Sequence, residues 1–381
     1  MSKNIVFVLH GIGEYDANWL QAESTAVHAL REAVASGGYE FFSNQSLDTY
    51  VEFVPVLYDD VFTRVLQHWN DLGEGLDQAI PAMPEAAGKV VKFLKKTDDD
   101  KWEIKKAGDV LLYWGFRLFR QRVHLRVLAQ ITNKVAATIN ASEQRPAYHI
   151  LAHGMGTAVA HNALHHLGTE DWLGALERAA FDDSDGQQGE SDHNNYRKNL
   201  ERLRDETGIA NPFHPREFQF ETVTMLCNLS ALLQGVESPY RSIVRPGSAS
   251  AEGACTRSYM SVNHKYDPIS IAGSFKMPSA WKMQGGTALS VEHVMDKNIH
   301  SAAHYVTHPD VHLRLLQWYV DPYFVSEGDA RAIGRFKQKH NIGKLADRAL
   351  KQKIEALKER GDVDIDTLVA AINKLEQLIK A

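Results

Sequence analysis

The sequence has little cysteine and no long apolar run. Two cysteines, Cys227 and Cys255, occur in 381 residues, which excludes a framework of disulfide bonds and predicts a reducing compartment, the cytoplasm. No run of about 18 apolar residues occurs, so the sequence gives no support for a membrane-spanning helix. The apolar run from Ile5 to Leu9 is too short for the core of a secretion signal and leads directly into a turn.

Basic residues are not in excess either. The chain has 42 Lys and Arg against 48 Asp and Glu, a net charge of −6, which excludes a general nucleic-acid binder with a basic face. Hydrophobic residues make up 44% and charged residues 24%, as in ordinary globular proteins. A disordered chain, a collagen and a coiled-coil rod are therefore excluded. The 18 histidines are unusual, but their number alone assigns no function, because histidine serves as ligand, base and core residue.

The order of apolar runs predicts an α/β fold. Residues 4–9 form a run that is apolar on both faces, as in a buried strand of a parallel sheet. A helical pattern over 18–35 and a second strand over 51–57 follow, which indicates a βαβ unit. Further strands are expected at 147–152, 222–229 and 258–263. The prediction is one domain over 1–325 with a mostly parallel sheet flanked by helices.

Three segments interrupt this rhythm. Residues 58–145 are predicted as a large helical insertion or cap, and residues 326–381 as a C-terminal extension with helices near 343–359 and 366–380. These last helices either dock on the domain, which we favour, or pair with a second copy of the chain. Residues 170–206 carry eleven Asp and Glu against five Lys and Arg with few apolar residues, which predicts a mobile acidic loop and leaves open a helix near its end.

The segment 101–134 within the insertion is basic and aromatic. It has eight Lys and Arg against two Asp and Glu, together with Tyr113, Trp114, Phe116 and Phe119. Such a helix can lie on a membrane surface, which leaves peripheral membrane contact open. We favour a lid or packing helix, because aromatic residues at helical spacing usually belong to a core.

Four short motifs combine glycine, histidine and aspartate where predicted strands end. The first is a glycine turn after residues 4–9, whose backbone N–H groups can face a ligand. The second runs from a strand into a helix, with small residues where the turn is tight. The third carries an aspartate after a strand, and the fourth carries several histidines. In chain order they are His10-Gly11-Ile12-Gly13, Ala152-His153-Gly154-Met155-Gly156, Asn263-His264-Lys265-Tyr266-Asp267 and His300-Ser301-Ala302-Ala303-His304-Tyr305.

Together these motifs resemble the α/β-hydrolase superfamily, in particular its bacterial serine esterases and lipases. The resemblance covers residues 3–57, 146–168, 220–233 and 258–313, in the family's order of nucleophile elbow, acid and base. It implies His300 as general base, Asp267 as the residue that fixes its tautomer, and the N–H groups of Met155 and Ile12 as the oxyanion hole. It implies no cofactor, and a small-molecule ester or lipid as substrate.

The sequence departs from the family at the nucleophile. The elbow pattern requires serine at position 154, where this chain has glycine. A glycine cannot attack a carbonyl, so the chain as written is predicted to be inactive in acyl transfer. It is either a natural pseudo-hydrolase that binds a ligand or acts as a scaffold, or a serine hydrolase disabled at this residue. We favour the second interpretation, because an abandoned site has no chemical need for Asp267 together with His300.

The late histidines allow two further interpretations. His304 is a rival general base one helical turn after His300, and we favour His300 because the family's base opens the segment that precedes a tyrosine-containing helix. The spacing of His300, His304, His308 and His312 would also suit a shared zinc ion, but Pro309 would distort the helix and no HExxH pattern occurs. We therefore predict no metal, and packing or surface roles for the last three histidines.

Overall fold

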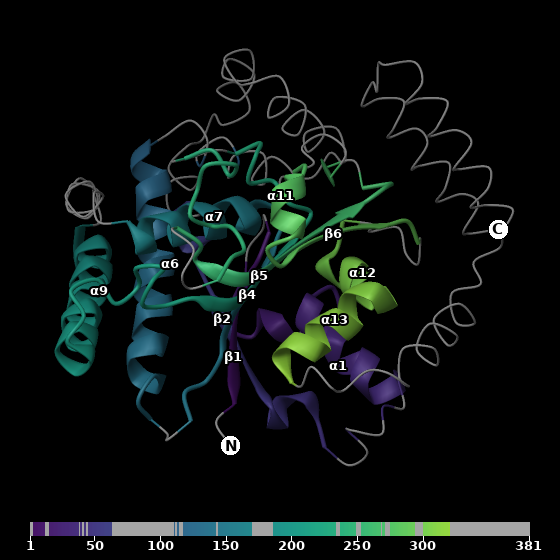
Figure 1. Cartoon of the computed structure of the whole chain (residues 1–381), viewed down its shortest axis with the longest axis horizontal. Coiled ribbons are helices and arrows are strands. Elements are labelled where there is room, and N and C mark those ends of the chain that lie inside the picture. Colours follow the sequence, from purple (N-terminus) through teal and green to yellow (C-terminus); the bar gives the residue numbers. More distant parts are fainter. Residues whose placement is uncertain are drawn as a thin grey trace, which may run out of the picture.

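Six parallel strands form one sheet with helices on both faces (Figure 1). The computed structural model describes residues 3–11, 15–37, 39, 42, 45–62, 110, 113, 117–141, 144–169, 186–233, 237–248, 253–267, 269–270, 275–293 and 300–320. The order of the strands across the sheet is β2-β1-β3-β4-β5-β6. Their bounds are β1 Asn4–Leu9, β2 Val51–Val56, β3 Tyr148–His153, β4 Phe220–Leu226, β5 Thr256–His264 and β6 Gly286–Val291.

The pairing of the strands confirms the parallel sheet that the sequence predicts. Every adjacent pair in this sheet is parallel, and all five predicted strands are present in it. The central strands β1, β3 and β4 are almost wholly buried, in keeping with their continuous apolar runs. Pro55 lies in β2, an edge strand, where a missing N–H breaks no ladder in the sheet interior. The strand β6 is a sixth strand that was not predicted.

The helices divide between the two faces of the sheet as the handedness of their connections requires. When all connections between parallel strands are right-handed, the connecting helices lie on one face of the sheet where the chain moves one way across the strand order, and on the other face where it moves the opposite way. The chain moves from β1 to β2 in one direction and from β2 to β6 in the other. Accordingly α1 (Ala26–Gly37) lies with α12 (Ala302–Thr307) and α13 (Pro309–Tyr319) on one side, and α6 (Arg117–Thr138) with α7 (Met155–Gly168) on the other (Figure 1). Shorter helices are η1 Trp19–Gln21, η3 Leu47–Thr49 and α11 Ser279–Lys282.

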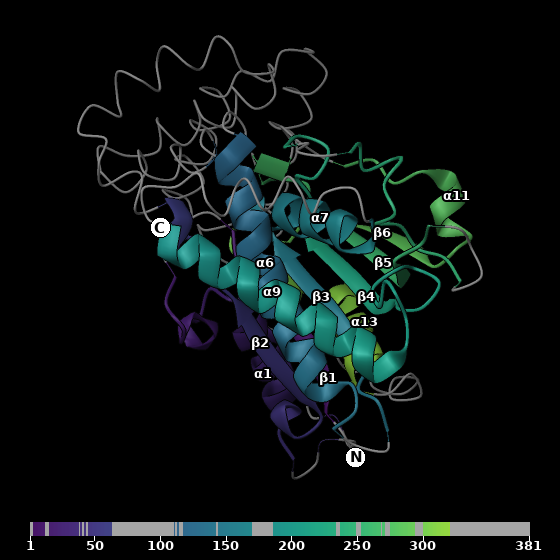
Figure 2. The same cartoon turned by 90° about the vertical axis from the view of Figure 1, so that its left-hand side faces the viewer.

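The acidic segment 170–206 is not a loop over its second half. Residues Gly186–Thr207 form helix α9, which lies along the outer side of α6 (Figure 2). Its contact face comes from Tyr196, Leu200 and Leu203, which are all buried and recur at helical spacing. The helix that the sequence left open near the end of this segment is therefore present, and it extends over 186–206 because three well-spaced apolar residues dock it on α6. Residues 170–185 lie outside the described residues.

Helix α6 forms the last part of the segment 58–145. It is the crossover helix between β2 and β3, packed between α7 and α9, and Arg126 on it contacts Asp60 at 2.8 Å and the buried Asp192 at 3.0 Å. Residues 63–109 of that segment and the C-terminal extension 326–381 lie outside the described residues. Within the described ranges, no helix has both the length and the apolar character needed to cross a bilayer.

Candidate active site

The residues of the four motifs that the structure describes meet at one edge of the sheet, where its parallel strands end. The chain leaves β1 for β2 on one side and later returns through β3 on the other side of β1, so the direction of the connections reverses between β1 and β3. In open parallel sheets ligands bind in the crevice at such a reversal, beyond the carboxyl ends of the strands. His10 and Gly11 follow β1, and Gly154 follows β3, so both motifs border this position.

Gly154 forms a sharp turn between β3 and α7. Its backbone has φ +55° and ψ −126°, a conformation that side-chain-bearing residues rarely adopt. The Gly154 N–H donates to the Leu226 carbonyl at 3.0 Å, and Thr157 Oγ1 donates to the Gly154 carbonyl at 2.7 Å. Helix α7 begins at the next residue, Met155, whose N–H belongs to the first turn and so has no acceptor within the helix. This geometry matches the strained strand-to-helix elbow that exposes a nucleophile.

Gly156 lets α7 approach β1 closely. A Cβ atom on this residue would lie 2.2 Å from the His10 carbonyl oxygen and 2.9 Å from that of Leu9. Both atoms belong to the backbone of a buried strand end, so neither can yield without moving the sheet. The small residue that the motif requires here is therefore a consequence of helix-to-strand packing.

We expect Gly156→Ala to destabilise the fold by about 3 kcal/mol, because the added methyl must displace backbone. Gly208→Ala is the matched control: Gly208 has φ +71° but no atom within 4 Å of the added Cβ, so only the left-handed penalty of about 1 kcal/mol applies. Urea denaturation of both variants measures the difference. Equal losses would show that the contact with His10 and Leu9 has no steric cost.

His300 and Asp267 form a hydrogen-bonded pair, as predicted. The distance from His300 Nδ1 to Asp267 Oδ2 is 2.8 Å, within the predicted range. The Asp267 side chain is fully buried, whereas 29% of the His300 side chain is exposed. The pair therefore has its acid inside the protein and its ring at the surface of the site, which is the arrangement a general base needs to meet a substrate.

Asp267 is held as a carboxylate by several donors. Tyr305 donates its O–H to Oδ2, and the Ile269 N–H donates to Oδ1 at 2.9 Å. Burial raises the pKa of the Asp267 carboxyl, but the charge and hydrogen bond of His300, with the bonds from Tyr305 and Ile269, outweigh burial and lower the pKa well below its ordinary value. An ionised Asp267 in turn requires the proton of the His300 ring to sit on Nδ1, which leaves Nε2 as the acceptor.

His300 Nε2 faces position 154. A Cβ built on Gly154 would lie 3.4 Å from His300 Nε2 and 3.6 Å from Gly11 Cα, which are ordinary van der Waals contacts. A hydroxyl one bond beyond that Cβ can therefore reach Nε2 without displacing its neighbours. His304 does not occupy this place: its ring bonds to the His293 carbonyl at 2.8 Å, which supports His300 as the base.

The turn after β1 is fixed by aromatic packing. The buried His10 ring is stacked between Tyr15 and Tyr58 at centroid distances of 4.2 and 4.1 Å, and its Nδ1 donates to the Gly11 carbonyl at 2.9 Å. Burial lowers the pKa of His10 to about 3, so the ring is neutral and its 3.7 Å approach to Asp59 is not an ion pair. Ile12 and Gly13, including the predicted oxyanion donor, lie outside the described residues.

The His153 ring lies beside His300. The centroids of the two rings are 4.7 Å apart. Burial, assisted by the nearby His300, lowers the pKa of His153 to about 3, so it adds no charge to the site. Gly11 leaves room for this ring, because a Cβ there would lie 3.1 Å from His153 Nδ1.

The later histidines have separate partners and do not converge with His300 on one point. His308 caps α13 by accepting from the Asp310 N–H at 3.3 Å. The buried His312 ring bonds to the Tyr39 hydroxyl at 3.0 Å. His304 is 2% exposed and lies in the core. His304 and His312 are buried packing residues, as predicted from the sequence, whereas His308 is a helix cap.

The sequence analysis assigned no role at the site to two residues that lie in it. Tyr305 bonds to Asp267, and Cys227, which follows β4 with φ +50°, lies with its Sγ within 4.8 Å of the Asp267 carboxylate and the His300 ring. Burial and the Asp267 charge raise the pKa of the Cys227 thiol well above its ordinary value, so it is not a thiolate nucleophile. Tyr305 was detectable in principle, because it lies beside His304, one helical turn beyond the base.

Among the residues that the structure describes, two groups of side chains have donor atoms close enough together for a metal ion to be considered. One is Cys227, Asp267 and His300, in which Asp267 and His300 are already bonded to each other. The other is His264, His293 and His304, whose ring nitrogens lie within 4.8 Å of one another. In both sets, one histidine comes from α12 or the residues just before it, and the other two residues lie at or shortly after the carboxyl end of a strand.

Comparisons of the chain with models of protein families, with curated proteins and with solved structures give no match.

Proposed function

We propose that the chain carries the catalytic framework of a serine hydrolase of the α/β-hydrolase fold, acting on carboxylic esters, with Gly154 in the nucleophile position. The observation that carries the proposal is that Asp267, His300 and residue 154 lie in line beyond the carboxyl ends of the strands. Asp267 holds His300 at 2.8 Å, and His300 Nε2 lies 3.4 Å from the Cβ position of residue 154. The strand order, with the direction reversal beside this edge, adds support.

The roles of the residues follow from this geometry with serine at position 154. His300 Nε2 takes the proton of the serine hydroxyl as the oxygen attacks the ester carbonyl, and later gives that proton to the leaving alcohol. Asp267 keeps the Nδ1 proton in place and stabilises the charged ring. The Met155 N–H, at the start of α7, donates to the oxygen that becomes negative, and the N-terminal end of that helix adds its dipole.

With glycine at position 154 the chain lacks the attacking oxygen. The hydrogen bonds that hold Asp267 and His300 do not involve a side chain at residue 154, so the arrangement of the pair does not depend on one. The glycine form is therefore proposed to bind an ester or lipid without acyl transfer. A natural pseudo-hydrolase with a binding or scaffolding role is the second candidate, favoured by the ease with which glycine adopts φ +55°.

Covalent labelling tests the proposed function. We expect Gly154→Ser to react with an alkyl phosphonate directed at active serines, giving one adduct per chain on residue 154. The unsubstituted chain and Gly154→Ala, which has the Cβ but no hydroxyl, should give none. Intact mass spectrometry and peptide mapping measure the adduct.

His300→Gln in the serine background should abolish this labelling, because the amide cannot accept the hydroxyl proton. The absence of an adduct on the folded serine variant, across phosphonates with short and long alkyl chains, would reject the hydrolase framework in favour of the binding protein.

A further inference from the structure

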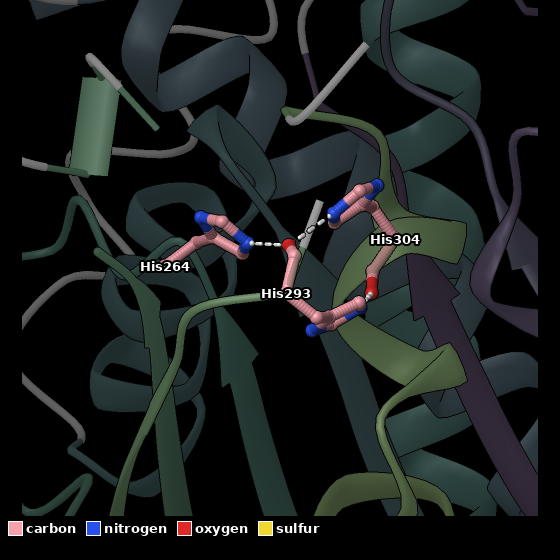
Figure 3. A group of neighbouring side chains, drawn as sticks. All are labelled: His264, His293 and His304. Carbon is pink, nitrogen blue, oxygen red and sulfur yellow. Dashed lines mark hydrogen bonds between the residues drawn. The ribbon is translucent and has the colours of Figure 1, made fainter. Parts of the chain in front are cut away.

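Three buried or half-buried histidines from three elements meet beside the acid–base pair (Figure 3). His264 ends β5, His293 follows β6, and His304 lies in α12. The Nε2 atoms of His264 and His304 approach the backbone oxygen of His293 from two sides, at 2.7 and 2.8 Å. The His293 ring bonds in turn to the His304 carbonyl at 2.8 Å. We call these three residues the histidine clasp.

The hydrogen bonds fix which ring nitrogens of the clasp carry protons. A carbonyl oxygen only accepts, so the Nε2 atoms of His264 and His304 must both be donors. His264 Nδ1 accepts from the Tyr266 N–H at 3.1 Å, so the proton of the neutral His264 ring lies on Nε2 and not on Nδ1. Burial lowers the pKa of His264 to about 4, so its ring is a neutral donor at neutral pH. The His293 oxygen thus uses both of its lone pairs on protein donors.

This arrangement argues against a metal ion between the rings. A metal would need the lone pair of His264 Nε2, but that nitrogen carries a proton as long as Nδ1 accepts from the Tyr266 backbone. The point toward which the two Nε2–H groups converge is also filled by the His293 oxygen. The clasp is therefore a set of hydrogen bonds between chain segments.

The clasp joins the same two segments that carry the acid and the base. His264 precedes Asp267 by three residues, and His304 follows His300 by four, or about one turn. The residue after His304 is Tyr305, which bonds to Asp267. The Ala303 N–H also donates to the Ser24 carbonyl at 3.0 Å, which ties α12 to the segment before α1. Besides the 2.8 Å bond of the pair, the two segments are thus held together at two further points, the bond between Tyr305 and Asp267 and the histidine clasp.

We infer that His264 and His304 are positioning residues: through the His293 carbonyl they set the His300 ring against Asp267 and position 154. The inference rests on the proposed function, since it assigns a role in that same site. Its physical basis is the sensitivity of proton transfer to placement, where an error of about 1 Å costs on the order of 10²-fold in rate. Neither residue touches the reacting atoms, so neither is a catalytic residue.

The test compares His304→Met with His304→Gln, each combined with Gly154→Ser. Methionine fills the space without a donor, whereas the glutamine amide can still donate to the His293 oxygen. We expect kcat for a short-chain ester, per site titrated by phosphonate, to fall by on the order of 10²-fold in the methionine variant with KM nearly unchanged. The glutamine variant should recover most of kcat.

His312→Met is the matched control, because His312 is also buried and also bonds to backbone carbonyls, but near the end of α12. It should lower the melting temperature without lowering kcat per titrated site. A residue with a merely structural role would lower activity by increasing the fraction of misfolded chains. Dividing the rate by the number of sites that react with the phosphonate removes this contribution from kcat.

Three results would overturn the inference. They are an unchanged kcat per site in His304→Met, an equal loss in His304→Gln, and stoichiometric zinc binding that His264→Gln abolishes. If the Gly154→Ser variant neither reacts with the phosphonate nor hydrolyses the ester, the proposed function fails, and the positioning role of the clasp is tested separately by NMR. The low-field Nδ1 proton resonance of His300 in the glycine form should then be lost in His304→Met and kept in His304→Gln.

Discussion

Gly154→Ser should raise ester hydrolysis by on the order of 10⁴–10⁶-fold over the unsubstituted chain, which is the loss that removal of a nucleophile causes in such enzymes. The reason is that the added hydroxyl would meet a base whose Nε2 lies 3.4 Å from the Cβ position and whose tautomer Asp267 already fixes. The measurement is kcat/KM on nitrophenyl esters of graded acyl length, which also reports the acyl chain that the pocket prefers.

Two matched variants isolate the hydroxyl and the acid in this experiment. Gly154→Ala keeps the backbone strain and the Cβ, and should remain as inactive as glycine. Asp267→Asn in the serine background should lower kcat by on the order of 10⁴-fold, because an amide no longer enforces the Nδ1–H tautomer of His300. Both substitutions at position 154 should cost about 1 kcal/mol of stability, because only glycine tolerates φ +55° without strain. Equal activity of the serine and alanine variants would contradict the mechanism.

Mild acid should unfold the protein. Burial lowers the pKa of five deeply buried histidines from 6.5 to about 3 for two of them and about 4 for three. Their exposed fractions are 6% or less. They are, in order, His10, His149, His161, His264 and His312.

The sign of the effect follows from proton binding. Below pH 6.5 the unfolded chain protonates these rings and the folded protein does not, so the free energy of unfolding falls as the pH falls. Each ring costs about 1.4 kcal/mol at pH 5.5, and five cost about 7 kcal/mol, which is comparable to the whole stability of a typical domain. Asp267 acts in a different window: its lowered pKa contributes stability that is present above about pH 4 and lost only below it.

Urea denaturation between pH 7.5 and 5 measures this slope, and calorimetry in buffers of different ionisation enthalpy counts the protons taken up on unfolding. We expect uptake of several protons per chain at pH 5.5 and a fold that is no longer stable near pH 5. His149→Gln should reduce the uptake by about one proton, because Gln does not titrate. A free energy of unfolding that stays constant from pH 7 to pH 5 would contradict the prediction.

The fold was predictable wherever burial was uniform along an element. The central strands are apolar on both faces, and each was found within a few residues of its observed bounds. The edge strand β6 alternates between exposed and half-buried residues, and its sequence GTALSV has no run to detect. Helix α9 was expected only near the end of the acidic segment, because the acidic composition outweighed the apolar spacing, although Leu200 and Leu203 lie on one face with Tyr196. Composition was the wrong guide there, and periodicity the right one.

At the site, the sequence predicted the pairing of Asp267 with His300 but not the residues that hold the pair in place. Asp267 and His300 follow from motif order, because strand ends of a parallel sheet share an edge. The choice between His300 and His304 depends on the path of the chain after His293, which no local pattern encodes. The same holds for Cys227 and Tyr305, whose contacts with Asp267 cross between elements.

The elbow glycine has an evolutionary consequence. All bonds that hold Asp267 and His300 are made without a side chain at residue 154, so folding places no demand on what stands there beyond tolerance of a left-handed backbone. Some serine and glycine codons differ by a single base. Under the proposed function, a lineage that hydrolyses and one that only binds therefore differ at this residue by one heritable step and by about 1 kcal/mol of stability.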